Sequence, residues 1–178
     1  MHEGVKGRSI DPLFINVLIK RLNPAWLRPW PGSNAVHTVD CGGRPTLMAR
    51  LPDEIRAAER AGGDTTVMVW ADVDDDMDGP EALKDAFWKA SEAAGIARNQ
   101  FDRVVFAFAK DRLENWIQFL NEGATDESLE GPRVRDGDAV RAARALADRC
   151  LRGETGGDFP PSLGWSCHNW RVLRRRMP

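Results

Sequence analysis

Blocks of apolar residues recur along the chain and predict buried strands. The most apolar block, residues 67–71, is rich in β-branched and aromatic side chains, which is typical of a strand buried on both faces of a parallel sheet. Residues 103–109 form a second block of this kind. Residues 35–39 form a third, which ends in a glycine-rich turn.

Apolar residues at helical spacing predict helices between these strands. Asp11 and Pro12 suit the first turn of a helix that ends before Pro24. Residues 45–61 predict a second helix, in which Pro52 is expected to kink or split the backbone. Further helices are predicted for residues 79–94, 110–120 and 138–152.

The alternation of strands and helices indicates an α/β fold. We predict a single domain over residues 1–178, with a Rossmann-like, mostly parallel central sheet of about four strands flanked by helices. A chain of 178 residues can bury a core of its own without disulfides or structural metals. A basic C-terminal segment is expected at about residues 159–178.

Composition narrows the classes of partner and compartment. The formal net charge of −2 gives the whole protein no attraction to polyanions, so any nucleic-acid surface must be local. Cys41, Cys150 and Cys167 are widely spaced and odd in number, which favours a reducing compartment over a disulfide framework. No apolar run approaches the length of about 20 residues that a membrane span needs, so we expect a cytoplasmic protein.

Five aspartates lie within seven residues directly after the most apolar strand: Asp72, Asp74, Asp75, Asp76 and Asp78. Two carboxylates about 4 Å apart repel each other by roughly 4 kcal/mol at an effective dielectric constant near 20. A cation relieves that repulsion, and ligand sites in open α/β sheets lie beyond the carboxyl ends of the strands. We therefore predict a metal site at Asp72 and Asp74.

Two glutamates stand at comparable positions in the predicted sheet. Glu3 follows what would be the first strand, and Glu114 lies just after the strand at residues 103–109. If those strands are neighbours, the carboxylates meet at one edge, where such hard oxygen ligands suit Mg²⁺ or Mn²⁺. An ion held there would polarise a phosphoryl oxygen and activate a water molecule.

The order of these residues resembles a known family. Glu3 and Gly4, followed by Ser9, Asp11 and an apolar helix, are similar to the opening of Toprim-fold proteins. Asp72 and Asp74, one residue apart after a hydrophobic strand, resemble the Asp-x-Asp signature of that family.

A narrower resemblance is to small bacterial Toprim-like proteins that can accompany ABC-type ATPases in phage defence. In that group a Glu and a Trp open the helix after the fourth strand, as Glu114 and Trp116 do here. The pair Gly42 and Gly43 before a helix fits the same group. The late segment with Ser166 and Trp170 does so as well.

The resemblance implies a Toprim-like domain and a Mg²⁺- or Mn²⁺-dependent nuclease that cuts phosphodiester bonds in DNA or RNA. On this pattern Glu3 is the general acid/base, Asp72 and Asp74 bind the metal, and Glu114 is an added ligand or orienting group. All four are predicted as catalytic and metal-binding residues. The implied partners are nucleic acid and an ABC-type ATPase or a second copy of the chain, without a membrane.

Two features depart from the family pattern. Only Met1 and His2 precede Glu3, so the first strand is expected to be very short. The chain has no tyrosine, which excludes the covalent chemistry of topoisomerases.

Basic residues supply the candidate nucleic-acid contacts. Lys110 lies beside the predicted site, where it would meet a phosphate as a point charge. The arginines of the C-terminal segment form the other candidate patch: Arg171, Arg174, Arg175 and Arg176. The alternative for these arginines is a solvated helix end that complements the helix dipole.

Each candidate also has a structural alternative. The aspartates are consistent with a solvated acidic loop, or with an EF-hand-like calcium loop that lacks the bidentate Glu at its twelfth position. Asp111 and Glu114 match a capping box. A non-catalytic Toprim-like module that assembles with a partner such as an ATPase is the alternative to the nuclease.

Overall fold

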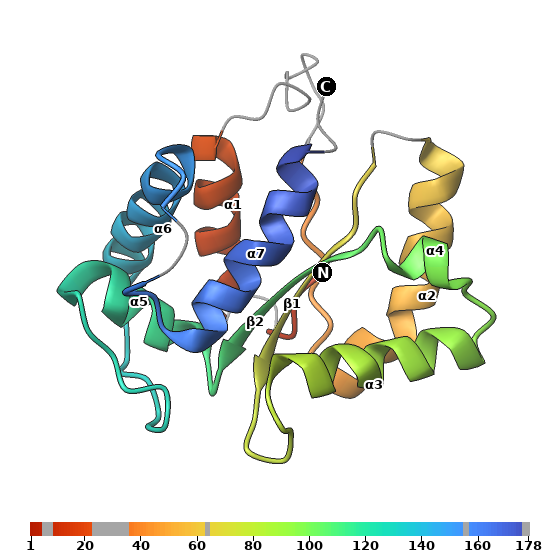
Figure 1. Cartoon of the computed structure of the whole chain (residues 1–178), viewed down its shortest axis with the longest axis horizontal. Coiled ribbons are helices and arrows are strands. Elements are labelled where there is room, and N and C mark those ends of the chain that lie inside the picture. Colours follow the sequence, from red (N-terminus) through yellow and green to blue (C-terminus); the bar gives the residue numbers. More distant parts are fainter. Residues whose placement is uncertain (5–8, 23–35, 63–64, 155–156, 176–178) are drawn as a thin grey trace.

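The structure is a computed structural model of the whole chain, and it describes residues 1–4, 9–22, 36–62, 65–154 and 157–175, with side chains no further than Trp170 (Figure 1). The elements follow one another as α1 (Asp11–Leu22), α2 (Arg44–Ala61), β1 (Met68–Val73), α3 (Pro80–Ala93), α4 (Arg98–Phe101), β2 (Val105–Lys110), α5 (Leu113–Glu122), α6 (Asp136–Leu151) and α7 (Pro161–Arg175). The predicted α/β class is confirmed.

The sheet is parallel but smaller than predicted. β1 and β2 pair in register from Met68 opposite Val105 to Val73 opposite Lys110. Among the described residues these are the only two strands, so the prediction of about four strands is wrong.

Two further segments extend the sheet by single parallel bridges, both made by His2, with Trp70 on one side and Asp40 on the other. Beyond Asp40 the chain turns at once, because Gly42 and Gly43 have φ angles of 68° and 133° and α2 follows directly. Since the turn lies next to the bridge, pairing on that side ends before a strand is established.

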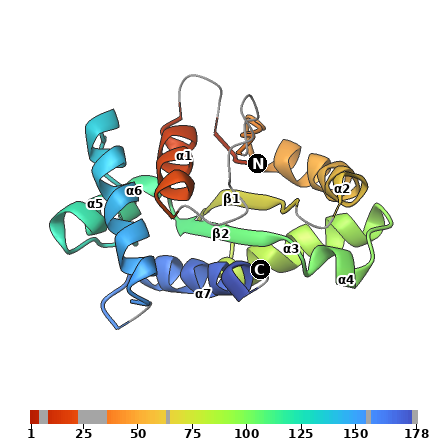
Figure 2. The ribbon, with the colours of Figure 1, turned by 90° about the horizontal axis from the view of Figure 1, so that it is seen from above.

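Helices cover both faces of the sheet, as Figure 2 shows. Trp70, Ala107 and Ala109 point to one face, where they pack with residues of α1, α5, α6 and α7. The intervening positions of β1 and β2 point to the other face and pack with α2, α3 and α4. This alternation follows from the two-residue period of a strand.

Trp70 is the centre of the first face. Its ring lies 6.2 Å from Phe14 of α1, 6.2 Å from Trp116 of α5 and 5.2 Å from Trp170 of α7, measured between ring centroids. A strand and three helices therefore meet at one aromatic cluster, which supports a core role for these tryptophans.

One expectation about a helix is corrected, and one helix was not predicted. α2 runs without a break from Arg44 to Ala61 although it contains Pro52, so Pro52 does not split it. Pro52 is buried on the packed face of the helix, where tertiary contacts offset the lost backbone hydrogen bond. The short helix α4 has no counterpart in the predicted pattern.

Helix α7 contributes to the core as far as Trp170. Ser166 of α7 accepts a hydrogen bond from the N–H of Phe108 at 2.9 Å and donates one to the carbonyl oxygen of Phe108 at 3.2 Å. Trp165 stacks on the Phe108 ring with centroids 5.3 Å apart. α7 thus covers the backbone edge of β2 that β1 does not pair, and so protects it from other strands.

Candidate functional site

Carboxylates gather where β1 and β2 end and where α1 and α5 begin. Asp72 is the second-last residue of β1, and Glu3 follows the bridge between His2 and Trp70. Asp11 is the first residue of α1, and Glu114 lies in the first turn of α5. Because the strands are parallel, their carboxyl ends lie at the same edge, which is where α/β sheets bind ligands.

Glu3 is held by two backbone donors. Its Oε1 accepts the N–H of Arg44 at 3.0 Å, and its Oε2 accepts the N–H of Asp72 at 3.3 Å. Burial raises the pKa of Glu3, while these two hydrogen bonds and the Arg44 charge act in the opposite direction. The carboxylate therefore has a fixed position and an increased affinity for a proton.

Asp72 is the most strongly perturbed of these acids. Burial raises its pKa well above the ordinary value, and the charges of Asp11, Glu3 and Glu114 raise it further. Glu3, Asp11 and Asp72 line a small cavity of about 10 Å³ beside Trp70. A volume of this size accommodates roughly one water molecule or one ion.

Glu114 belongs to the same group of acids. Burial raises its pKa, as does the charge of Asp11, while a hydrogen bond from its own backbone N–H lowers it. α5 begins at Leu113 with Arg112 at the N-cap and no side-chain cap. The capping-box alternative is therefore wrong.

Asp111 has another position than the predicted cap. Its backbone is left-handed, with a φ angle of 61°, and its Oδ2 accepts the N–H of Gly131 at 3.3 Å. This conformation is costly for a residue other than glycine. It turns the chain sharply between the end of β2 and the first turn of α5.

Asp74 lies at the rim of the acidic group. Its side chain is 51% exposed, and its Oδ2 lies 3.3 Å from Nη2 of Arg44. Its charge nevertheless contributes to the raised pKa of both Glu3 and Asp72. Asp72 thus lies inside the group and Asp74 at its edge.

Asp75 and Asp76 are exposed, as expected for the alternative of a solvated acidic loop. Nζ of Lys110 lies 2.7 Å from Oδ1 of Asp75, and Nη2 of Arg44 lies 3.0 Å from Oδ2 of Asp76. Of the five aspartates, Asp72 is therefore half-buried within the acidic group, and Asp74, Asp75 and Asp76 pair with nearby cations.

Asp11 is a member of the group that the sequence suggested as a helix start and as part of the Toprim-like opening, but not as a site residue. Its Oδ2 lies 3.3 Å from Nδ1 of His2, a fully buried side chain whose Nε2 is 2.5 Å from Oδ1 of Asp40. A Cβ added to Gly4 would lie 2.3 Å from the Cβ of Ser9 and 2.8 Å from Oδ2 of Asp11. The closeness of Gly4 and Asp11 was thus signalled in the sequence by a glycine directly after Glu3.

The predicted nucleic-acid contacts have different outcomes. Lys110 ends β2 beside the acidic group, in an ion pair with Asp75. Arg171, Arg174 and Arg175 lie in the last turns of α7, but their side chains are not described. Arg176 lies outside the described residues.

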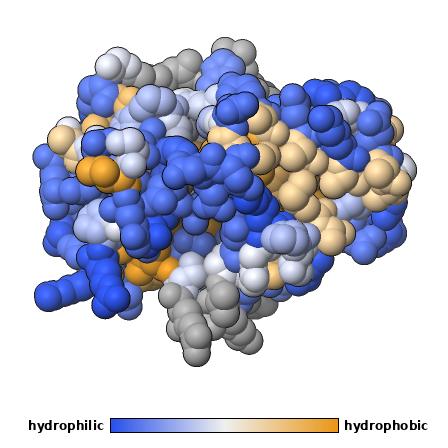
Figure 3. Space-filling model, turned by 90° about the horizontal axis from the view of Figure 1, so that it is seen from below, coloured by the Kyte–Doolittle hydropathy of each residue, from blue (hydrophilic) through white to orange (hydrophobic). Residues whose placement is uncertain are grey.

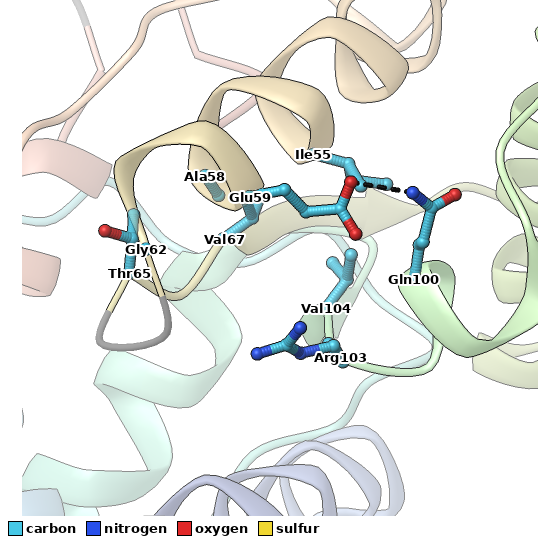
Figure 4. Close-up of a pocket in the computed structure, with 9 residues that line it drawn as sticks. All are labelled: Ile55, Ala58, Glu59, Gly62, Thr65, Val67, Gln100, Arg103 and Val104. Atoms are coloured by element: carbon cyan, nitrogen blue, oxygen red, sulfur yellow. Dashed lines mark hydrogen bonds between the residues drawn. The ribbon is translucent and has the colours of Figure 1, made fainter.

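A larger cavity, of about 260 Å³, lies at the opposite end of the strands. Figure 4 shows Glu59 and Gln100 bridging it and Arg103 beneath them, and the hydrogen bond from Gln100 to Glu59 is 2.7 Å long. Val67 and Val104, which precede β1 and β2, also line it. None of the predicted site residues lines this larger cavity, which lies at the amino ends of the strands, away from the acidic group.

The acids fit a hard divalent cation by their chemistry. Their oxygen atoms are the ligands that Mg²⁺ and Mn²⁺ prefer. Burial and, second to it, repulsion from neighbouring acids raise the pKa of Asp72, Glu3 and Glu114, and a cation would favour their charged forms. Across the part of the chain that is described, no three His, Cys, Asp or Glu side chains are already placed to hold a metal ion together. Binding would thus require the carboxylates around the cavity to draw closer.

The described residues define an α/β protein with a parallel sheet and a group of acids at its carboxyl edge. Comparison with family models found no match, and comparisons with curated proteins and with solved structures found none either. None of the described helices is both long and apolar enough to cross a membrane.

Proposed function

We propose that this protein is a Mg²⁺- or Mn²⁺-dependent phosphodiesterase of Toprim type that cuts DNA or RNA. The observation that carries the proposal is the position of Asp72. It lies half-buried beside a cavity of ion size, and burial and four further acids raise its pKa. Such a group is unfavourable for the fold alone, because burial and mutual repulsion disfavour the charged carboxylates, and the charges of Arg44 and Arg112 act against this only at Glu3 and Glu114.

Three acids from three segments would hold the ion: Asp72 at the end of β1, Glu3 after the bridge and Asp11 at the start of α1. Glu114 borders them from α5, and Asp74 stands at the rim. A divalent ion bound there supplies a Lewis acid that polarises a phosphoryl oxygen.

Glu3 is the proposed general acid/base. An efficient acid/base has a pKa close to the working pH, and burial shifts the pKa of Glu3 upwards, in that direction. The N–H groups of Arg44 and Asp72 fix its two oxygens. The side chain is therefore oriented before a substrate binds.

The Toprim-like, Rossmann-like arrangement is part of the proposal. Four backbone segments lie side by side and parallel, in the order Asp40, His2, β1 and β2. Of the motif residues, Glu3 and Glu114 follow such segments and Asp72 lies near the end of β1. A role in phage defence beside an ABC-type ATPase rests on the resemblance of these motifs alone.

A non-catalytic module is the second candidate. The specific observation in its favour is that no three acidic or other metal-binding side chains among the described residues are already grouped for an ion. In that case the carboxyl edge would bind a partner protein and not a reacting phosphate.

The test compares nuclease activity on DNA and RNA, with Mg²⁺ or Mn²⁺, between the wild type and the variants Asp72→Ala and Asp74→Ala. Asp53→Ala is the matched control, because Asp53 is an 84% exposed aspartate on α2. We expect loss of cleavage in Asp72→Ala and full activity in the control. If the wild type is inert and calorimetry detects no divalent ion, the enzyme proposal fails. Ion binding without cleavage would favour the module.

A further inference from the structure

The loop between β1 and α3 is connected to two cations that flank the acidic group. Arg44 of α2 contacts Asp74 at 3.3 Å and Asp76 at 3.0 Å. Lys110 at the end of β2 contacts Asp75 at 2.7 Å. Three consecutive aspartates of one loop therefore occupy both cations.

The two cations are placed more firmly than their partners. The side chains of Arg44 and Lys110 are 18% and 28% exposed, while those of Asp74, Asp76 and Asp75 are 51%, 63% and 101% exposed. Ion pairs with such exposed carboxylates contribute only about 0–1 kcal/mol each. The aspartates are thus partners that another anion can replace at little cost.

Arg44 also has unused capacity to donate. Its Nη2 serves both oxygens of Asp76, at 3.0 Å each. Its Nη1 is buried and has no hydrogen-bond partner among the described residues. Arginine matches phosphate with two parallel N–H donors, a geometry that strengthens the contact.

Both cations lie next to the proposed reaction site. The backbone N–H of Arg44 donates to Glu3 at 3.0 Å. Lys110 is opposite Val73 in the sheet, one position beyond Asp72. Figure 3 shows the face onto which the β1–α3 loop projects in Figure 1, and hydrophilic residues dominate much of it.

We propose that Asp74, Asp75 and Asp76 take the place of substrate phosphates in the free protein, and that a nucleic-acid strand binds by displacing them from Arg44 and Lys110. The chemical class of this ligand rests on the proposed function. Arg44 and Lys110 then become the phosphate-contacting residues of the site. Release of Arg44 also frees Asp74, the acid at the rim of the cavity.

The experiment measures fluorescence anisotropy of labelled single-stranded DNA and RNA oligonucleotides of one sequence, in EDTA and over a series of salt concentrations. Arg44→Ala should weaken binding about tenfold or more, because it removes charge-assisted hydrogen bonds, and should lower the salt slope by about one. Arg56→Ala is the control, since Arg56 is an arginine on the same helix that pairs with an exposed aspartate.

The opposite change tests the displacement itself. The double variant Asp75→Asn/Asp76→Asn should bind the oligonucleotide about threefold to tenfold more tightly, because the competing carboxylates are gone. The double variant Asp53→Asn/Asp85→Asn removes two exposed charges elsewhere and should change affinity much less. Lys110→Ala repeats the loss at the second cation if Arg44→Ala does not fold, as judged by circular dichroism.

The two proposals fail in different measurements. Oligonucleotide binding in EDTA is independent of an ion and of cleavage. If the wild type binds neither oligonucleotide at low salt, or the two double variants bind equally, displacement is excluded. Ion-dependent cleavage that is lost in Asp72→Ala would still support the proposed function in that case.

Discussion

Asp72 lowers the stability of the ion-free fold, because it lies among other acids. Burial and four neighbouring carboxylates all disfavour its charged form. Replacement by an amide of the same shape removes that penalty. Asp72 therefore opposes the stability of the ion-free protein, which is typical of a residue retained for function.

Asp72→Asn should accordingly stabilise the protein in EDTA at neutral pH. We expect a gain on the order of 1–3 kcal/mol in the free energy of unfolding, and a rise of about 2–4 °C in Tm for each kcal/mol. Thermal denaturation measures this directly. Asp53→Asn is the control, and a loss of stability in Asp72→Asn would contradict the assigned cause of the pKa shift.

The stability of the ion-free protein should also fall with increasing pH. The folded pKa values of Asp72, Glu3 and Glu114 are all raised, so the folded state binds more protons than the unfolded state above about pH 4. Their favourable contribution is complete below the unfolded pKa and is lost as pH rises through the folded pKa.

Urea denaturation in EDTA at a series of pH values above about pH 4 gives the free energy of unfolding as a function of pH. This free energy should fall less steeply with pH in Asp72→Asn than in the wild type. Equal slopes in the wild type and the variant would show that Asp72 does not titrate as proposed.

Gly4 is the residue whose size limits the approach of α1 to Glu3. Gly4→Ala would place a Cβ 2.3 Å from the Cβ of Ser9 and 2.8 Å from Oδ2 of Asp11. Such overpacking costs about 1–3 kcal/mol. Gly137→Ala in α6 is the matched control, since nothing lies within 4 Å of its added Cβ, and it should stabilise by roughly 0.5–1 kcal/mol. Equal Tm values for the two variants would argue against a tight Gly4 site.

At the scale of elements, local signals predicted most helices well. Asp11 with Pro12, and Gly79 with Pro80, mark the starts of α1 and α3, because capping and proline chemistry act within a few residues. The continuous apolar runs at residues 67–71 and 103–109 likewise predicted β1 and β2. The segment near Asp40 failed to become a strand, because its pairing depends on distant residues and the glycine turn follows at once.

The sequence did not show how α7 packs. Its cations suggested a basic surface segment, whereas Leu163, Ser166 and Trp170 of α7 are buried. Whether a helix with few apolar residues lies on a sheet is decided by the partner surface, here the open edge of β2. No local pattern within residues 161–175 contains that information.

Ser166→Ala tests the attachment of α7 to β2. The substitution removes a donor to the Phe108 carbonyl and leaves the Phe108 N–H without its 2.9 Å acceptor. An unpaired buried donor costs about 1–3 kcal/mol. Ser91→Ala is the control, because Ser91 is equally buried and its hydroxyl has no hydrogen-bond partner among the described residues. Ser166→Ala should unfold at lower urea concentration than Ser91→Ala, and the reverse order would exclude this role of the hydroxyl.

At the scale of the whole molecule, the sequence predicted at which edge of the sheet the acids lie better than it predicted which acids belong to the group. Parallel strands bring Glu3, Asp72 and Glu114 to one edge, and the order of the motifs was sufficient to predict this. It did not reveal that Asp11 points inwards while Asp74 turns to Arg44. Side-chain direction at a strand end depends on the helices packed around it, which the order along the chain does not determine.

The acidic group should connect the stability of the entire fold to divalent ions. An ion that binds only the folded state raises the free energy of unfolding by about 2.7 kcal/mol at a concentration of one hundred times its Kd. Each kcal/mol raises Tm by roughly 2–4 °C. The carboxylates must lose their protons to bind it. Because burial raises the pKa values of Asp72 and Glu3, the shift in Tm with Mn²⁺ or Mg²⁺ should increase as pH rises from about 5 to 8. Asp72→Asn should lose the shift and Asp53→Asn should keep it. A metal-induced shift in Tm of equal size in both variants would show that the ion binds elsewhere on the surface. The proposed metal site at the carboxyl edge of the sheet would then be wrong.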